Sequence, residues 1–167
     1  MPQLVTLLTD FGTEDSYVAE MKAILFSQLP TLNVVDITHH IPPFDIERGA
    51  FQLLRSYGWF PAPTYHLAVV DPGVGSQRKC LYISTAHGHF IGPDNGVLLW
   101  AVRDAERRKK KPALIYEIPV PPETLPTFNG RDVLAPFLAN LLRGKKMRLR
   151  RLEQMAGREF PLPQKRK

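Results

Sequence analysis

The stretch 64–73, "TYHLAVVDPG", decides the fold class, because a short apolar run ends abruptly in Asp-Pro-Gly. A run of this length that is followed by a Pro-Gly turn is typical of a buried strand. Two earlier segments have the same form, "LVTLLTDFG" at 4–12 and "LNVVDIT" at 32–38. All three strands end next to polar residues, which predicts a sheet whose chemistry lies at the carboxyl ends of its strands.

Segments with helical periodicity separate and follow these strands. Residues 15–29 carry apolar side chains at helical spacing, with acidic residues at the start. Residues 41–60 form a proline-broken loop that leads into a second amphipathic helix. Further on, "DVLAPFLANLLRG" at 132–144 predicts a helix that begins close to Val133, because Pro136 fits only near a first turn.

The middle of the chain adds more strands. "KCLYIST" at 79–85 and "GHFIG" at 88–92 predict two strands that can form a hairpin, and "ALIYEI" at 113–118 predicts a later strand. Residues 95–102 begin either a helix or a strand, and "RRKKK" at 107–111 is expected to be an exposed loop. This alternation predicts an α/β domain with a mostly parallel central sheet and helices on both faces, a Rossmann-like three-layer arrangement.

The charge of the chain is unevenly distributed. The sequence holds 22 Lys/Arg and 16 Asp/Glu, but ten of the basic and two of the acidic residues lie in 143–167. Residues 1–142 therefore hold 12 basic and 14 acidic residues, a net charge of −2. A basic tail can contact nucleic acid or membrane phosphates, but a solvated terminus is the commoner outcome. We expect residues 150–167 to be poorly ordered or to lie along the surface.

Length and cysteine content limit the class of protein. A chain of 167 residues suits one globular domain with a sizeable core. Cys80 is the only cysteine, which excludes an internal disulfide and a multi-cysteine zinc site and makes the cytoplasm the expected location. No apolar run approaches the roughly 20 residues that cross a bilayer, and the N-terminus lacks the features of a signal peptide, so we expect no membrane partner.

Two polar motifs follow predicted strands, and each could be no more than a turn. In "TDFG", at 9–12, Asp10 can bond nearby backbone groups, and "VVDPGVG", at 69–75, has the Pro and Gly of a tight turn. A turn alone, however, does not require the Arg78 that stands seven residues after Asp71. The two interpretations, turn and binding site, stay open at this point.

A third motif, "GPDNG" at 92–96, precedes an apolar element. It lacks the glycine spacing of a dinucleotide fingerprint and the lysine of a phosphate loop. The neighbouring His39 and His40 point in different directions, and no other ligand set stands near them, so we expect no metal site.

The motifs decide the function only in combination. In chain order they are "TDFGTEDSYVAEMKAIL", "VVDITHHIPPFDIERGAF", "HLAVVDPGVGSQR", "FIGPDNGVLL" and "TFNGRDVLAP". Together, over roughly residues 3–142, they resemble the S-adenosylmethionine hydroxide adenosyltransferase family, which is related to fluorinating and chlorinating enzymes. The resemblance implies hydrolysis of S-adenosylmethionine to adenosine and L-methionine, by attack of water or hydroxide on the ribose 5′ carbon. It implies no cofactor beyond this substrate.

The resemblance also implies catalytic residues. An Asp–Arg–His set manages the water in the family, and Asp71 and Arg78 match its first two members. The third belongs to "TFHGRD", where this chain has Asn129. An amide cannot take a proton at neutral pH, so activity is impaired if the histidine is the base and survives if it only orients water. Halogenating relatives carry Tyr in place of Asp71 and Ser in place of Gly130, so the chain is closer to the water-using branch.

Four further residues match substrate-binding positions of the family. Asp10 matches the carboxylate that holds both ribose hydroxyls, a task that suits two acceptor oxygens. Asp15 matches an acidic residue near the methionine end, Phe44 an aromatic that packs on the substrate, and Asn95 a residue that lines the pocket. Asp132 is expected to be the N-cap of the last helix.

The family pattern extends beyond this sequence. Its members carry a C-terminal β-barrel of about a hundred residues, which grips the adenine in a pocket shared with a neighbouring subunit, and they form trimers. This sequence ends at Lys167, in what resembles the interdomain linker, so the barrel is expected to be absent from it. We expect an S-adenosylmethionine-binding α/β domain at 1–142, a basic tail at 143–167, and a homotrimer.

Three functions stay open at this stage. The first is a hydrolase domain, the second a non-catalytic protein that binds adenosine or S-adenosylmethionine, and the third a module whose basic tail binds RNA or membrane phosphates, which we expect least. The hydrolase interpretation predicts a geometry. The Asn129 side chain should lie within direct or one-water hydrogen-bond reach of Asp71 or Arg78.

Overall fold

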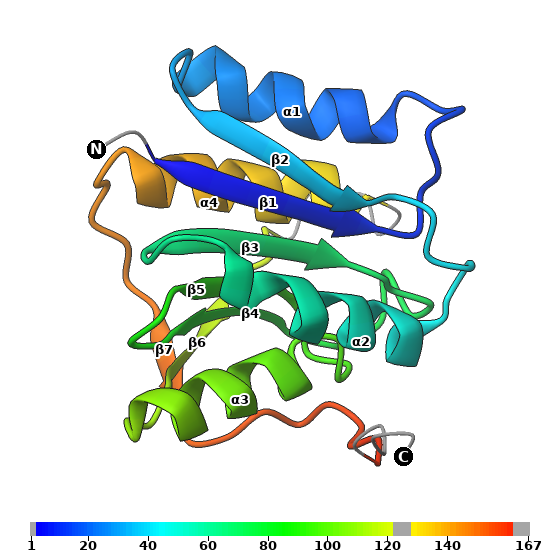
Figure 1. Cartoon of the computed structure of the whole chain (residues 1–167). Coiled ribbons are helices and arrows are strands. Elements are labelled where there is room, and N and C mark those ends of the chain that lie inside the picture. Colours follow the sequence, from blue (N-terminus) through cyan, green and yellow to red (C-terminus); the bar gives the residue numbers. More distant parts are fainter. Residues whose placement is uncertain (1–2, 122–127, 162–167) are drawn as a thin grey trace.

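A seven-stranded mixed sheet forms the centre of the computed structural model, which describes residues 3–121 and 128–161 (Figure 1). In chain order the strands are β1 (Leu4–Thr9), β2 (Asn33–Thr38), β3 (Thr64–Val69), β4 (Cys80–Ser84), β5 (His89–Pro93), β6 (Leu114–Ile118) and β7 (Arg150–Leu152). In the sheet they lie in the order β2-β1-β3-β5-β4-β6-β7. The pairs among β2, β1, β3 and β5 are parallel, and those that join β5, β4, β6 and β7 are antiparallel.

Helices cover both faces of this sheet, as the sequence predicts. They are α1 (Tyr17–Gln28), α2 (Ile46–Ser56), α3 (Leu99–Lys109) and α4 (Ala135–Leu142), with a 3-10 turn at Tyr57–Trp59 and a π-helical turn at Gly130–Leu134. α1 lies beside α4 on one face, and α2 lies beside α3 on the other (Figure 1). None of the helices in the described ranges is long and apolar enough to span a bilayer.

Alternation along the strands divides the core between the two faces. Leu7 of β1 and Leu67 of β3 belong to the apolar cluster that includes α1 and α4. The next residues, Leu8 and Ala68, belong to the cluster that includes α2 and α3. Successive side chains of a strand point to opposite faces, so continuous apolar runs are what a sheet covered on both sides requires. The predicted three-layer α/β class is therefore confirmed.

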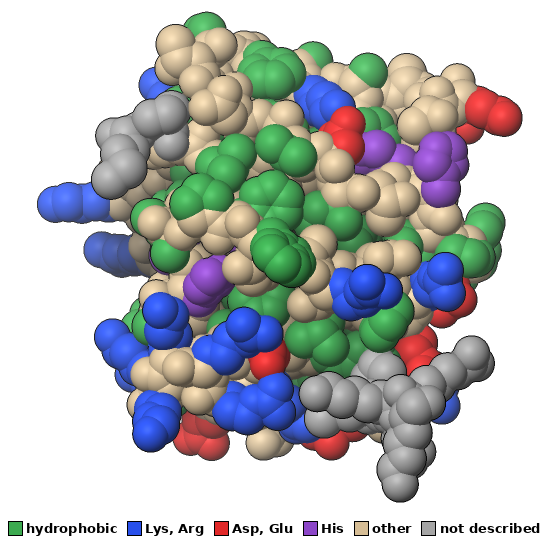
Figure 2. Space-filling view, viewed as in Figure 1, with side chains coloured by type: hydrophobic (Ala, Val, Ile, Leu, Met, Phe, Trp, Pro, Cys, Tyr) green, Lys and Arg blue, Asp and Glu red, His purple; other side chains and the backbone are tan. Residues whose placement is uncertain are grey.

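The region before and within α3 settles one open prediction and corrects another. Residues 95–102, which fit a helix or a strand, contain the start of α3. "RRKKK" is only in part a loop, because Arg107, Arg108 and Lys109 form the last turn of the helix, and Lys110 and Lys111 follow it. They are exposed, as predicted, and basic side chains gather over this helix in Figure 2. Cations at the C-terminal end of a helix interact favourably with its dipole, so this run extends the helix.

The last helical segment begins earlier than Val133. A π-helical turn starts at Gly130, whose carbonyl accepts from the backbone N–H of Ala135. α4 then begins at Ala135 with Pro136 in its first turn, as expected for a proline. The predicted N-cap, Asp132, lies inside the turn and binds Arg131 instead. Single π-helical turns are frequent at functional sites.

The tail lies along the surface, as predicted, but it also carries regular structure. Residues 150–152 form β7, which pairs antiparallel with β6 at the edge of the sheet. A free strand edge leaves backbone N–H and C=O groups without partners, and β7 supplies them. Residues 155–160 then run along α3 (Figure 1). The end of the predicted tail, 162–167, lies outside the described residues.

Candidate functional site

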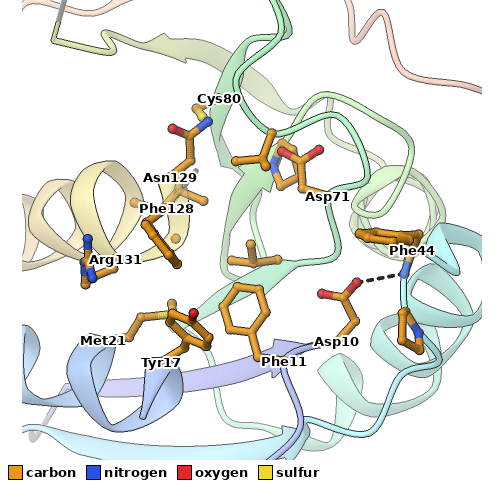
Figure 3. A pocket seen from close by; sticks show the side chains of 16 residues that line it. Asp10, Phe11, Tyr17, Met21, Phe44, Asp71, Cys80, Phe128, Asn129 and Arg131 are labelled. Carbon is orange, nitrogen blue, oxygen red and sulfur yellow. Dashed lines mark hydrogen bonds between the residues drawn. The ribbon is translucent and has the colours of Figure 1, made fainter. Parts of the chain in front are cut away.

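A cavity of about 280 Å³ opens at the carboxyl ends of β1 and β3, where ligands bind in parallel sheets (Figure 3). Register explains why the two strands meet there, since Thr9 of β1 lies beside Val69 of β3. The residues that follow each strand, Asp10 and Asp71, both line the cavity. The segment 128–131, at the start of the π-helical turn, also lines it, and Phe44 lines it from the loop before α2.

One wall of the cavity is aromatic. The rings of Tyr17 and Phe128 stack with centroids 5.1 Å apart and an interplanar angle of 26°. Phe11 meets Tyr17 edge-on at 6.1 Å. The Arg131 guanidinium lies over the outer ring, 4.5 Å from the centroid of Phe128. Stacked rings of this kind provide a flat apolar surface for a planar or cationic ligand.

Arg131 fastens the π-helical turn to α1. Its Nη1 lies 2.9 Å from Oε2 of Glu20, and its Nε lies 2.6 Å from Oδ1 of Asp132. These pairs raise the pKa of Arg131, first through the hydrogen bond with Asp132 and then through that with Glu20. Arg131 therefore stays charged and holds the aromatic wall in place from behind.

Asp10 faces the cavity from the end of β1. Its Oδ2 accepts a hydrogen bond from the backbone N–H of Phe44 at 2.8 Å, drawn in Figure 3. Burial raises the pKa of Asp10, and this hydrogen bond opposes that shift. Phe44 has a φ of 67°, a left-handed backbone that few residues other than glycine adopt, and 65% of its surface is exposed. The bond to Asp10 holds this unusual turn at the rim of the cavity.

Asp71 and Arg78 form an ion pair beside the cavity. Burial raises the pKa of Asp71, the Arg78 charge lowers it, and the charge of Asp10 raises it again. The guanidinium lies so close to Gly73 that a Cβ built there would stand 2.1 Å from Nη2 of Arg78. A side chain at position 73 would push this guanidinium away from Asp71, so the second residue of the "PG" turn leaves room for the ion pair.

Asn129 stands between two cavities. It lines the aromatic cavity with Asp71, and it also lines a neighbouring polar cavity of about 390 Å³ with Ser76, Arg78 and Glu117. The predicted placement of Asn129 near Asp71 and Arg78 therefore has geometric support. No direct hydrogen bond joins Asn129 to either residue within the described ranges, so contact through one water stays a prediction.

Two of the residues predicted to bind substrate do not line this cavity. Asp15 is exposed in the segment before α1. Asn95 is buried, and its amide forms hydrogen bonds with the backbone. Its Nδ2 donates to the Val70 carbonyl at 2.8 Å, and its Oδ1 accepts from the Val97 N–H at 3.1 Å. The roles predicted for Asp15 and Asn95 therefore lack the support that the cavity gives to the other residues.

Several lining residues are absent from the sequence-based predictions. Phe11 follows Asp10, Phe128 precedes Asn129, and Tyr17 opens α1, so proximity to the motifs is the signal that could have identified them. Cys80, the first residue of β4, also lines the cavity. Burial raises the pKa of its thiol to about 12, so the thiol is neutral and a poor nucleophile. Within the described ranges, no three His, Cys, Asp or Glu side chains are grouped to hold a metal ion.

Several curated proteins are similar to this chain over most of its length. It is 41% identical over 151 residues to the (R)-S-adenosyl-L-methionine hydrolase of Thermus thermophilus, a match that covers 84% of this chain and 57% of the relative. The corresponding hydrolase of Salinispora tropica is 38% identical over 140 residues, covering 84% and 53%. A fluorinase of Nocardia brasiliensis is 24% identical over 164 residues, covering 84% and 54%. The chain thus spans about half the length of the curated relatives it matches.

A solved structure and a family match agree with these relatives. An uncharacterized conserved protein from Thermotoga maritima has a TM-score of 0.82 and 33% identity, over 93% of this chain and 61% of that chain. Residues 5–150 match the N-terminal domain of the SAM hydroxide adenosyltransferases. The chain therefore belongs to the SAM hydroxide adenosyltransferase family.

Proposed function

We propose that the protein hydrolyses S-adenosylmethionine to adenosine and L-methionine. The observation that carries the proposal is the aromatic cavity at the carboxyl edge of the sheet, which joins Asp10 to the Asp71–Arg78 ion pair. The relatives named (R)-S-adenosyl-L-methionine hydrolase, at about 40% identity, support the same substrate.

The cavity suits a sulfonium substrate on electrostatic grounds. A sulfonium carries a positive charge, which aromatic faces attract through their quadrupole. The Asp10 carboxylate supplies further negative charge, whereas Arg78 balances the charge of Asp71. Asp10 also offers Oδ1, since Oδ2 already accepts from Phe44. We assign Asp10 to the ribose hydroxyls, where a carboxylate can accept charged hydrogen bonds.

The reaction needs an activated water and no general acid. The oxygen of water attacks the ribose 5′ carbon, and the sulfur leaves with the electrons of the C–S bond as a neutral thioether. The proton passes to a base, for which Asp71 is the proposed residue because burial raises the pKa of its carboxyl. The Nε of Arg78 is buried without a hydrogen-bond partner in the described part of the chain, so it can hold the attacking oxygen. Asn129 would orient the same water.

We propose that a second surface, outside the residues of this chain, completes the substrate site. Phe44 lies at the rim and is exposed over most of its surface, which supports a neighbouring surface that completes the pocket. We infer a homotrimer with an adenine-binding barrel at the subunit boundary, as the family resemblance implies. We also infer a cytoplasmic location, in keeping with the single buried thiol of Cys80.

Chromatography of S-adenosylmethionine after incubation with the protein tests the activity. We expect equal amounts of adenosine and methionine, and their loss in Asp71→Asn, which keeps the size of the side chain. If neither product forms, even when a barrel domain of the family is added, the hydrolase proposal fails. Binding of S-adenosylmethionine without turnover would then favour the non-catalytic alternative, which the Asn129 in place of a histidine supports.

A further inference from the structure

Two consecutive residues hold both ends of the loop that carries Asp71 and Arg78. At the start of the loop, Nδ2 of Asn95 donates to the Val70 carbonyl at 2.8 Å. At its end, the backbone N–H of Asp94 donates to the Lys79 carbonyl at 2.9 Å. The Val70 carbonyl belongs to the peptide bond that precedes the catalytic aspartate, so its orientation sets where that side chain begins.

The rest of this loop, 71–78, is bonded mainly to itself. The backbone N–H of Gly73 donates to Oδ1 of Asp71, and that of Ser76 donates to the Gly73 carbonyl. The N–H of Arg78 donates to the Ser76 hydroxyl. Bonds within a loop give it an internal shape but do not fix it to the body of the protein. The two bonds from 94–95 therefore locate the ion pair relative to the cavity.

A segment of the tail in turn holds Asp94. Asp94 is buried, with 8% of its surface exposed, and its carboxylate accepts from the backbone N–H of Ala156 at 3.0 Å and from that of Gly157 at 2.9 Å. We call residues 155–160 the strap. A buried carboxylate without partners is costly, so the strap supplies what Asp94 needs to stay in place.

The strap has a second anchor and a close contact. The indole Nε1 of Trp100 donates to the Phe160 carbonyl at 3.1 Å, and the two rings meet edge-on at 6.0 Å. At the first anchor, the backbone of Gly157 lies against Gly96, and a Cβ built at Gly157 would stand 2.4 Å from the Gly96 nitrogen. Any larger residue at 157 must therefore lift the strap away from the Asp94 loop.

We propose that Asp94 and Asn95 are positioning residues for the Asp71–Arg78 pair, and that the strap holds them in place. The proposal rests on the proposed hydrolysis and gives "GPDNG" a role other than substrate contact. Neither Asp94 nor Asn95 lines the aromatic cavity. The chain of contacts runs from the strap through the Asp94 carboxylate to the two loop ends.

The single cysteine makes this arrangement measurable without substrate. Cys80 follows the held loop end at Lys79 and is 1% exposed, so a thiol reagent should reach it faster when the loop opens. Gly157→Val should detach the strap and speed Cys80 labelling at least about tenfold under native conditions. Glu159→Gln is the matched control on the same segment, because it breaks only an exposed ion pair with Arg103, and its labelling rate should stay within about twofold of wild type.

Kinetics separate positioning from general destabilisation. In Gly157→Val, kcat should fall at least about tenfold while KM changes by less than about threefold, because the Asp10 side of the cavity is untouched. Labelling of Cys80 at the wild-type rate in Gly157→Val would overturn the proposal, as would equal acceleration in Glu159→Gln. If Gly157→Val does not fold, Asp94→Asn replaces it with the same criteria. A wild-type protein that releases no adenosine counts against the hydrolase proposal alone, since the labelling needs no turnover.

Discussion

Replacing Asp10 by Asn tests the proposed substrate orientation most directly, because it removes the charge and keeps the size of the side chain. Oδ2 of Asp10 accepts from the Phe44 N–H at 2.8 Å, and an amide oxygen can take over that bond. The other position then carries an NH₂ group, which cannot accept from a ribose hydroxyl. A hydrogen bond to a charged group contributes about 1.5–3 kcal/mol. The affinity for adenosine should therefore fall about 10- to 150-fold.

The same substitution should leave the fold at least as stable. Burial raises the pKa of Asp10 in the folded state, so the folded protein binds this proton more tightly than the unfolded chain does. A raised carboxyl pKa means that stability is lost as the pH rises from the unfolded to the folded pKa. At pH 7 the ionised carboxylate therefore opposes folding, and its removal should keep or raise the melting temperature.

Calorimetric titration with adenosine and a thermal melt measure both effects. Asp45→Asn is a matched control: Asp45 caps α2 by accepting from the Arg48 N–H at 2.9 Å, and Asn caps a helix equally well. Its adenosine affinity and melting temperature should equal those of the wild type. An Asp10→Asn protein that binds adenosine as tightly as the wild type would refute the assignment of Asp10 to the ribose.

Three other substitutions test the water, the buried hydroxyl and the buried imidazole. Asn129→His should speed adenosine release by up to about 10²–10⁴-fold if proton transfer is rate-limiting, and an unchanged rate would leave the proton to Asp71. Tyr57→Phe should lower the free energy of unfolding in urea by about 1–2 kcal/mol, because the hydroxyl donates to Asp104 at 2.5 Å; an unchanged urea midpoint would contradict this. Burial lowers the pKa of His66 to about 3, so stability should fall as the pH drops from about 6.5 toward 3. The fall between pH 7 and 4.5 should be smaller in His66→Leu, and equal falls in both proteins would count against this explanation.

The central strands are predictable because their signal is local. β1 and β3 are largely buried on both faces, and each ends at a polar turn. Their length and their ends can therefore be predicted from the sequence. β7 has no such signal, since "RRL" at 150–152 lacks any apolar alternation. It forms because β6 has a free edge and because Arg150 lies 2.8 Å from Glu117 on that strand. Only the folded sheet creates both conditions.

The meeting of Asp10 and Asp71 is also predictable, since parallel neighbouring strands deliver the residues after their carboxyl ends to the same edge. The hydrophobic periodicity of the sequence does not predict that Arg78 and Asn129 also lie at that edge. It depends on loop paths, which only the family resemblance suggested. Asn95 shows the limit of such a resemblance, because position in a motif does not fix the direction of a side chain. Its amide is committed to Val70 and Val97.

The orientation of Asn129 toward the cavity cannot be predicted from the sequence "NGRDVL", because it depends on the backbone geometry of the helical turn that follows. The turn at Gly130–Leu134 is π-helical, so it holds one residue more than an α-helical path would. The extra residue shifts the preceding segment around the helix axis, and Phe128 joins the aromatic wall while Asn129 lines both cavities. Gly130 packs beside Met21 and Phe11, since a Cβ built on it would be in van der Waals contact with them at 3.4 and 3.5 Å. The position of the Asn129 amide, which we propose orients the water, is thus set by backbone geometry, and a histidine introduced there would begin from the same backbone.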